Sequence, residues 1–171
     1  MYLRASQFLA SASLALSALT CSAQSSTPQY GVKEVEAPAG SNIKRYVTSG
    51  SHIPINRTYQ ELSPEEKSAV NTYYEKVEPG DEPPFPLEGL RPIHEAIGKV
   101  QQRLLVTGRL ILVVSVGADG IPIDVRAVGS PSPAMTKAAA SIILLSKFKP
   151  ALCKGEPCRM EFPFSFAFEV R

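Results

Sequence analysis

The stretch CRMEFPFSFAFEV, residues 158–170, decides the fold. A bulky apolar residue recurs at every second position, and this period of two is typical of a half-buried β-strand. Cys153 precedes Cys158 closely enough for residues 154–157 to form a hairpin turn closed by a cystine. The segment therefore predicts a strand, a stapled hairpin and an oxidising compartment.

Composition limits the classes of protein that fit this chain. It has 171 residues, 44% hydrophobic and 20% charged, which suffices for one core and is too few for two ordinary domains. Eighteen Lys and Arg against sixteen Asp and Glu give a net charge of +2, and neither sign forms a long block. A phosphate-binding surface is not predicted, so no nucleic-acid partner is expected.

Residues 1–23 have the features of a signal peptide: Arg4, then an apolar run, then small residues at Cys21 and Ala23. We expect cleavage after Ala23 and export. Lipidation of Cys21 and an uncleaved leader are the two alternatives, and membrane contact is expected only in those cases. The apolar run is shorter than the ~20 residues of a membrane span, which disfavours an uncleaved anchor.

Cleavage of the leader would leave Cys153 and Cys158 as an even pair. In an oxidising compartment such a pair normally forms a disulfide. Redox chemistry and metal binding fit less well, because four residues separate the cysteines and His52 and His94 have no ligand spacing toward them. We predict a structural disulfide Cys153–Cys158, with no metal site and no cofactor.

The composition changes along the rest of the chain. Residues 24–40, rich in Ser and Pro, are predicted to be a flexible linker. Residues 41–90 are predicted to be an N-terminal extension with one helix, from a capping box at Ser63 to Val77. Its tyrosine pair, Tyr73 and Tyr74, is assigned to core contacts rather than to ligand stacking. The prolines of residues 81–86 predict an extended strap across the surface.

Residues 91–171 carry the longer periodic segments. A helix is predicted from Pro92 to Leu105 and another from Ser132 to Lys147. Between them, residues 110–116 and 121–128 predict a β-hairpin around the turn Asp119-Gly120. In its return strand the expected core-facing residues are Ile121, Ile123, Val125 and Ala127. The predicted fold class is α+β: a small antiparallel sheet (hairpin, helix, third strand) with helices packed on one face.

From Gly108 onward the predicted elements follow the order hairpin, helix, strand. Turn signals occur at Gly108, Asp119-Gly120, Phe148-Lys149-Pro150-Ala151 and Gly155-Glu156-Pro157. In this order residues 91–171 resemble the C-terminal domain of the TonB family. The resemblance implies a periplasmic domain of Gram-negative bacteria that binds an extended segment of an outer-membrane TonB-dependent receptor by strand addition. The family usually has an uncleaved membrane helix and a long proline-rich spacer, whereas here the leader has the features of a cleavable one and the tether is short. Binding is therefore the expected part of the family's role, and whether energy transduction is retained is left open.

The resemblance also implies that the strand over residues 110–116 lies in the middle of the sheet, with an edge strand on either side. Pro163 lacks an N–H, so its parity in the last strand is predicted to face outward. The candidate partner-binding residues share that parity: Arg159, Glu161, Pro163, Ser165, Ala167 and Glu169. Pro122 interrupts the other edge in the same way, and both prolines are expected to limit indiscriminate pairing. The protein is expected to be a monomer or a strand-paired dimer.

Catalysis is not predicted. The chain has two histidines, His52 in a loop and His94 beside an apolar stripe, and no Gly-rich phosphate loop or carboxylate cluster. The alternative to receptor binding is an envelope scaffold or lipoprotein of the same fold without an energy-transducing role. Two interpretations of Gly40–Pro54 stay open: it lies along the domain's own sheet edge, or it is an extended loop.

Overall fold

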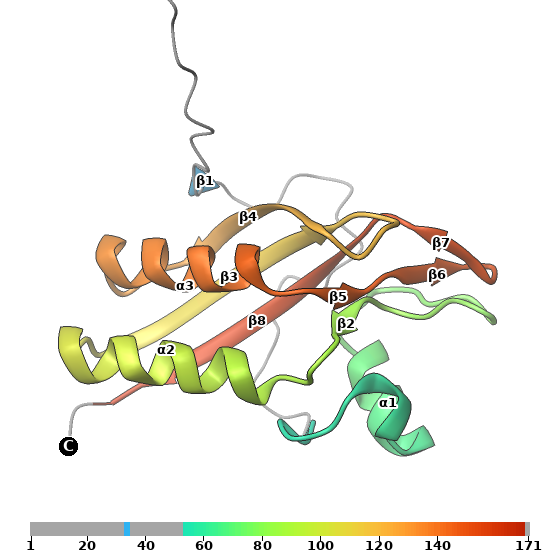
Figure 1. Ribbon diagram of the computed structural model, residues 1–171, viewed down its shortest axis with the longest axis horizontal. Coiled ribbons are helices and arrows are strands. Elements are labelled where there is room, and N and C mark those ends of the chain that lie inside the picture. Colours follow the sequence, from blue (N-terminus) through green and yellow to red (C-terminus); the bar gives the residue numbers. More distant parts are fainter. Residues whose placement is uncertain (1–32, 35–52, 170–171) are drawn as a thin grey trace, which may run out of the picture.

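The computed structural model describes residues 33–34 and 53–169 (Figure 1). Its largest sheet has four strands in the order β1-β4-β3-β8. Their bounds are Lys33–Glu34 for β1, Gly108–Val116 for β3, Pro122–Gly129 for β4 and Met160–Phe168 for β8. The central strand β3 pairs antiparallel with β4 and with β8, which confirms the predicted middle position and the α+β class.

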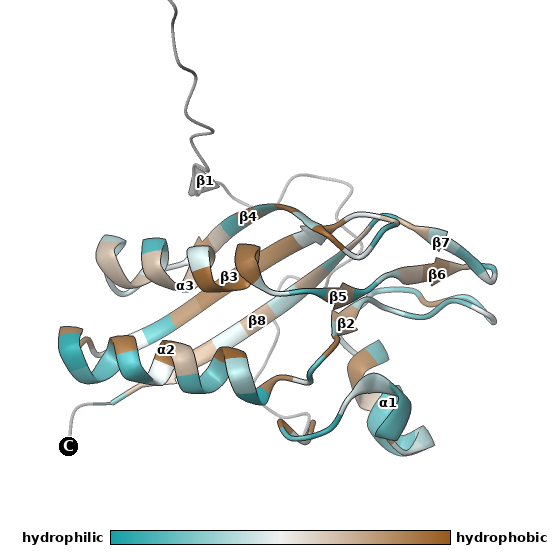
Figure 2. Ribbon diagram, viewed as in Figure 1, coloured by the Kyte–Doolittle hydropathy of each residue, from teal (hydrophilic) through white to brown (hydrophobic). Residues whose placement is uncertain are grey.

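Two helices, α2 (Arg91–Leu104) and α3 (Pro133–Leu145), lie side by side over one face of this sheet (Figure 1). Apolar colour is concentrated on β3 beneath them (Figure 2). Alternate residues of the two longest strands supply the buried face: Leu110, Leu112, Val114, Val116, Phe162, Phe164, Phe166 and Phe168. They form one cluster with Ile97 of α2 and Ile143 of α3, so the period of two seen in the sequence is the core face.

The turn between β3 and β4 is tied to the chain after α3. Asp119 closes the turn by accepting the Ile121 N–H at its Oδ1, at 3.0 Å. Gly120 has φ +79°, and its carbonyl accepts the Phe148 N–H at 3.0 Å. A Cβ at Gly120 would lie 2.2 Å from the Phe148 carbonyl oxygen. Two of the turn signals on which the family resemblance depends are therefore in direct contact, and only glycine fits between them.

The return strand β4 departs from simple alternation. Val125 and Ala127 are buried as predicted, but Ile121 and Ile123 are 61% and 48% exposed. The pairing of β3 with β4 shifts register between Ser115 and Val116. This irregularity interrupts the period of two at the start of β4, so the prediction that both isoleucines face the core was wrong.

The N-terminal extension, residues 53–90, contains a 3₁₀ helix (Tyr59–Glu61), helix α1 (Pro64–Asn71) and strand β2 (Phe85–Pro86). The predicted capping box is present: Glu66 N–H donates to Ser63 Oγ at 3.3 Å, and Ser63 N–H donates to a Glu66 carboxylate oxygen at 2.8 Å. Helix α1 ends at Asn71 rather than Val77. Tyr73 and Tyr74 make core contacts, as predicted, but from the turn after the helix.

The strap is buried rather than laid across the surface. Strand β2 pairs with β5 (Phe148–Lys149), and Glu82 forms a bridge with Leu152. Pro83, Pro84 and Phe85 are fully buried, so the predicted surface position was wrong. The Phe85 ring lies edge-on to Phe162 with centroids 5.8 Å apart. The proline-rich composition suggested a surface loop, but burial of the apolar Phe85 ring in the core beside β8 favours the buried position of the strap.

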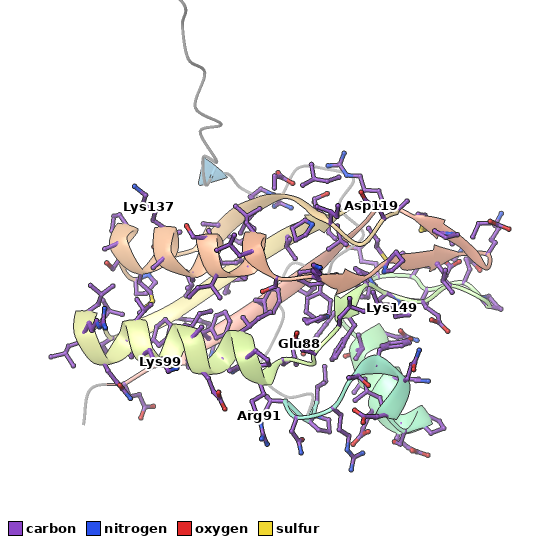
Figure 3. The ribbon with its side chains drawn as sticks, viewed as in Figure 1. Glu88, Arg91, Lys99, Asp119, Lys137 and Lys149 are labelled. Atoms are coloured by element: carbon purple, nitrogen blue, oxygen red, sulfur yellow. A yellow bond between two sulfur atoms is a disulfide. The ribbon has the colours of Figure 1, made fainter. Side chains whose placement is uncertain are left out.

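Lys149 of β5 joins the same two regions (Figure 3). Its Nζ lies 2.9 Å from a Glu82 carboxylate oxygen and 4.5 Å from the centroid of the Tyr59 ring. Burial, reinforced by the negative charge of Glu82, raises the pKa of Tyr59 to about 12. The tyrosine is therefore neutral at physiological pH and presents its ring face to the ammonium group.

Strands β6 (Ala151–Cys153) and β7 (Glu156–Cys158) form the stapled hairpin. The predicted disulfide Cys153–Cys158 is confirmed, with the Cα atoms 5.8 Å apart. The turn is tighter than predicted: only Lys154 and Gly155 form it, both with positive φ, as in a type I′ hairpin. Its amides hold the extension, since Lys154 N–H donates to Asp81 Oδ1 at 2.7 Å and Gly155 N–H to the Gly80 carbonyl at 3.2 Å.

The predicted linker contributes a short strand. Lys33 and Glu34 form β1, which pairs parallel with Arg126 and Ala127 of β4. The expectation that β4 is an edge was therefore wrong at these two residues, because main-chain pairing there is already taken. The leader with Cys21 and Ala23, His52, and the Gly40–Pro54 segment before Ile53 lie outside the described residues.

Candidate partner-binding edge

The candidate site is the outer edge of β8, the side away from β3. Among the described residues β8 has β3 as its neighbour and no strand on its other side. The phenylalanine side chains of β8 point to the helix-covered face. Consecutive rings are nearly parallel, at 5° for Phe164 and Phe166 and at 8° for Phe166 and Phe168, with centroids 6.0 and 6.3 Å apart. This stack, here called the phenylalanine ladder, holds the strand from one face.

Two of the six predicted site residues lie outside the strand. Arg159 stands between β7 and β8, and its Nε donates to Ser115 Oγ at 2.8 Å. Cys158 is paired with Ala151 in the stapled hairpin, so the chain leaves that hairpin at Arg159 before it enters the sheet. Glu169 follows Phe168, the last residue paired with β3. The prediction of one strand from Cys158 onward was wrong at both ends.

Glu161 is engaged by its side chain and by its backbone. A carboxylate oxygen lies 3.1 Å from Arg126 Nη2, so the ion pair reaches from β4 to β8 over the central strand. The Glu161 carbonyl accepts the Tyr74 hydroxyl at 2.8 Å. Burial raises the pKa of Tyr74 well above its usual value, and the charge of Glu161 adds to the effect, so this donor keeps its proton. The outward carbonyl of Glu161 is therefore already used.

The remaining residues of that parity are Pro163, Ser165 and Ala167. Pro163 is buried opposite Val113, while Ser165 is partly buried and Ala167 is exposed. The carbonyl of Glu161 faces a residue outside the sheet, which fits the predicted outward parity two residues on at Pro163. Among the described residues, no neighbouring strand pairs with the Pro163 carbonyl or with the outward main-chain groups of Ser165 and Ala167.

Other kinds of site have little support in the part of the chain that is described. His94 packs its ring 5.0 Å from Phe166, and burial lowers its pKa. Over these same residues no group of three His, Cys, Asp or Glu side chains is placed to hold a metal ion. Nor does any described helix have the length and apolar character to cross a membrane.

Comparison with known proteins identifies this part of the chain. Residues 99–170 match the family described as the Gram-negative bacterial TonB protein C-terminal. They form a TonB C-terminal-like domain. The predicted resemblance is thereby confirmed, and the chain carries a TonB-like module. A similar solved structure is the TonB C-terminal domain of Helicobacter pylori, determined in solution by NMR: it is 21% identical, with a TM-score of 0.33, and the match covers 65% of this chain and 99% of that one. No curated protein matches the chain.

Sequence reasoning missed Tyr74 as a residue of the edge. The hydrogen bond joins residues 87 positions apart, so no local pattern reveals it. The available signal was chemical, because a buried tyrosine hydroxyl usually finds a hydrogen-bond partner. In this TonB-like module the partner is the outward carbonyl of Glu161, one of the predicted partner-binding residues.

Proposed function

We propose that this protein is a periplasmic interaction module that binds an extended segment of an outer-membrane TonB-dependent receptor by strand addition at the outer edge of β8. The observation that carries the proposal is the open edge at Ser165 and Ala167, where the described residues supply no neighbouring strand. The family match over residues 99–170 supports it. An added strand would gain main-chain hydrogen bonds while its alternate side chains meet the two faces of the sheet.

The partner-binding residues proposed are those with outward parity on the strand, chiefly Ser165 and Ala167. Pro163 contributes a carbonyl and no donor, so a partner pairs more weakly there. The phenylalanine ladder lies on one side of the added strand, which favours apolar partner residues at alternate positions. No catalytic step is proposed.

A titration read by NMR tests this function. Isotope-labelled protein isolated after export would be titrated with peptides copied from the N-terminal box of a TonB-dependent receptor. We expect shifts at Pro163–Phe168 in wild type. Ser165→Pro removes an outward N–H without removing a bond to β3, so binding should weaken about fivefold or more for each hydrogen bond lost. Ser165→Ala keeps the N–H and should bind like wild type.

A structured protein that shows no shift at high peptide concentration would contradict receptor binding. That outcome would favour the second candidate, an envelope scaffold of the same fold. The capped Glu161 carbonyl and Pro163 are the observations behind this candidate, since each removes one pairing group from the edge.

The proposed location has its own test. Export with cleavage after Ala23 predicts a mature N-terminus at Gln24, and lipidation predicts an acylated Cys21 instead. The intact mass of the protein from the envelope fraction separates the two. A protein that retains residues 1–23 would contradict both.

A further inference from the structure

Tyr73 and Tyr74 straddle the first part of β8. Tyr74 is 2% exposed and packs with Val113, whose parity in β3 is opposite to that of the residues beneath α2 and α3. The partly buried Tyr73, Val77 and Met160 pack against these two side chains. Tyr73 also contacts the main core cluster, where its ring is edge-on to Phe162 with centroids 6.3 Å apart. The chain itself thus passes the edge of β8 at Met160–Phe162.

The hydroxyl of Tyr74 takes the place that a partner's main-chain donor would occupy. It donates to the Glu161 carbonyl at 2.8 Å, which is the distance of a full O–H···O hydrogen bond. A partner strand could pair with this carbonyl in the same way only after the Tyr74 hydroxyl had given up its hydrogen bond. The desolvation of an unpaired hydroxyl in the core would oppose that exchange.

Beyond Tyr74 the usable edge is short. Pro163 has no donor, so beyond Glu161 the outward N–H groups are those of Ser165 and Ala167. Strand β8 ends at Phe168. Pairing groups therefore run from the Pro163 carbonyl to Ala167, a span of about five residues in a β-strand.

We propose that Tyr74 is a built-in stop that restricts the partner of this edge to a short extended segment of about five residues, with apolar side chains on the side of the phenylalanine ladder. The inference rests on the proposed function and specifies the length and register of the segment that it binds. Extra partner residues on the Tyr74 side cannot pair with the Glu161 carbonyl, because the Tyr74 hydroxyl occupies it.

The experiment compares peptide length in two proteins. Peptides of five and nine residues from a receptor box, sharing the same core, are titrated into exported wild-type protein and into Tyr74→Phe. In wild type we expect the longer peptide to bind within about threefold of the shorter one, with shifts confined to Pro163–Phe168. In Tyr74→Phe the Glu161 carbonyl is released, so the longer peptide should gain about fivefold, as for one added hydrogen bond.

Tyr59→Phe is the matched control, because it removes a hydroxyl from the same extension away from the edge of β8. It should leave the length dependence of wild type unchanged. The wild-type comparison stands without any variant, so a folding defect in Tyr74→Phe does not block the test.

The outcomes separate the two proposals. Shifts that reach Met160–Phe162 in wild type, or a nine-residue peptide that binds about tenfold tighter than the short one, would overturn the stop while leaving receptor binding intact. If folded Tyr74→Phe showed the same ratio of nine-residue to five-residue peptide affinity as wild type, the proposed stop would also be overturned. If neither peptide binds, the proposed function and the stop fall together.

Discussion

The N-terminal extension and the TonB C-terminal-like domain look different as sequences and behave as one body in the fold. The extension has an eight-residue helix and a two-residue strand, whereas β3 and β8 of the domain have nine residues each. Yet Val70 and Phe85 of the extension are completely buried in the same cluster as Phe162. A family boundary is therefore not a folding boundary here, because the core crosses it.

The largest expected effect comes from Phe85→Ala. Removal of a fully buried ring that contacts Phe162 and Tyr59 should lower the free energy of unfolding by about 3–5 kcal/mol. Chemical denaturation measures the loss, and hydrogen exchange should show weakened amides in β3 and β8. Leu87→Ala, at a residue 50% exposed in the next turn, is the control and should have little effect. Exchange changes confined to residues 53–90 would contradict a shared core.

A pair of glycine substitutions separates the domain's own turn from the hairpin that holds the extension. Gly120 and Gly155 have similar φ values, +79° and +86°, but only Gly120 is crowded, by Phe148. Gly155→Ala should cost about 1–2 kcal/mol from the left-handed backbone alone. Gly120→Ala should cost about 3 kcal/mol, since overpacking adds to the same backbone term. If the two variants lost the same amount of stability in thermal or chemical denaturation, crowding by Phe148 would make no contribution to the cost of Gly120→Ala.

Loss of the disulfide should loosen the extension before the sheet. The double variant Cys153→Ser and Cys158→Ser is expected to lower stability by about 2 kcal/mol, the low end for a short loop. The hairpin turn donates to Asp81 and Gly80, so amides of the strap should lose exchange protection first. Wild type reduced by a dithiol serves as the control and should match. An equal loss of exchange protection in β3 and in the strap would contradict the idea that the hairpin mainly stabilises the extension.

The smallest effect is a pH dependence at His94, where helix α2 covers β8. Burial lowers the pKa of His94 below its ordinary value of 6.5, so the unfolded chain binds a proton more readily than the folded one. Stability is therefore expected to fall as the pH drops below about 6.5. His94→Gln should show a smaller dependence in denaturation series above and below that pH. An identical dependence in the variant would assign the titration to other groups.

Much of the domain was predictable because its signals are local. The period of two in β8, the apolar run of β3 and the capping box at Ser63 each specify an element from neighbouring residues. The parity argument from Pro163 is of the same kind. The misses have a different origin: α1 ends early and the strap is buried, because Tyr74 and Phe85 find partners far away in the sequence. Tertiary contacts of this sort override composition and turn signals.

The outer edge of β8 likewise has one part that was predictable from local sequence and one part that was not. Its open stretch at Ser165 and Ala167 follows from strand parity, whereas its closed stretch depends on a hydroxyl contributed by the extension. Ile121 and Ile123 show the same limit on a smaller scale, since a register shift in the neighbouring strand exposes residues that alternation would bury.

The phenylalanine ladder also bears on what binding would cost. Three stacked residues that are 3–8% exposed, Phe164, Phe166 and Phe168, hold this part of β8 in strand geometry within the protein's own sheet. An incoming segment would therefore meet a template that is already ordered, and nearly all the conformational entropy lost on pairing would come from the segment. Affinity at such an edge should respond more to stiffening the peptide than to any change in the protein's own backbone.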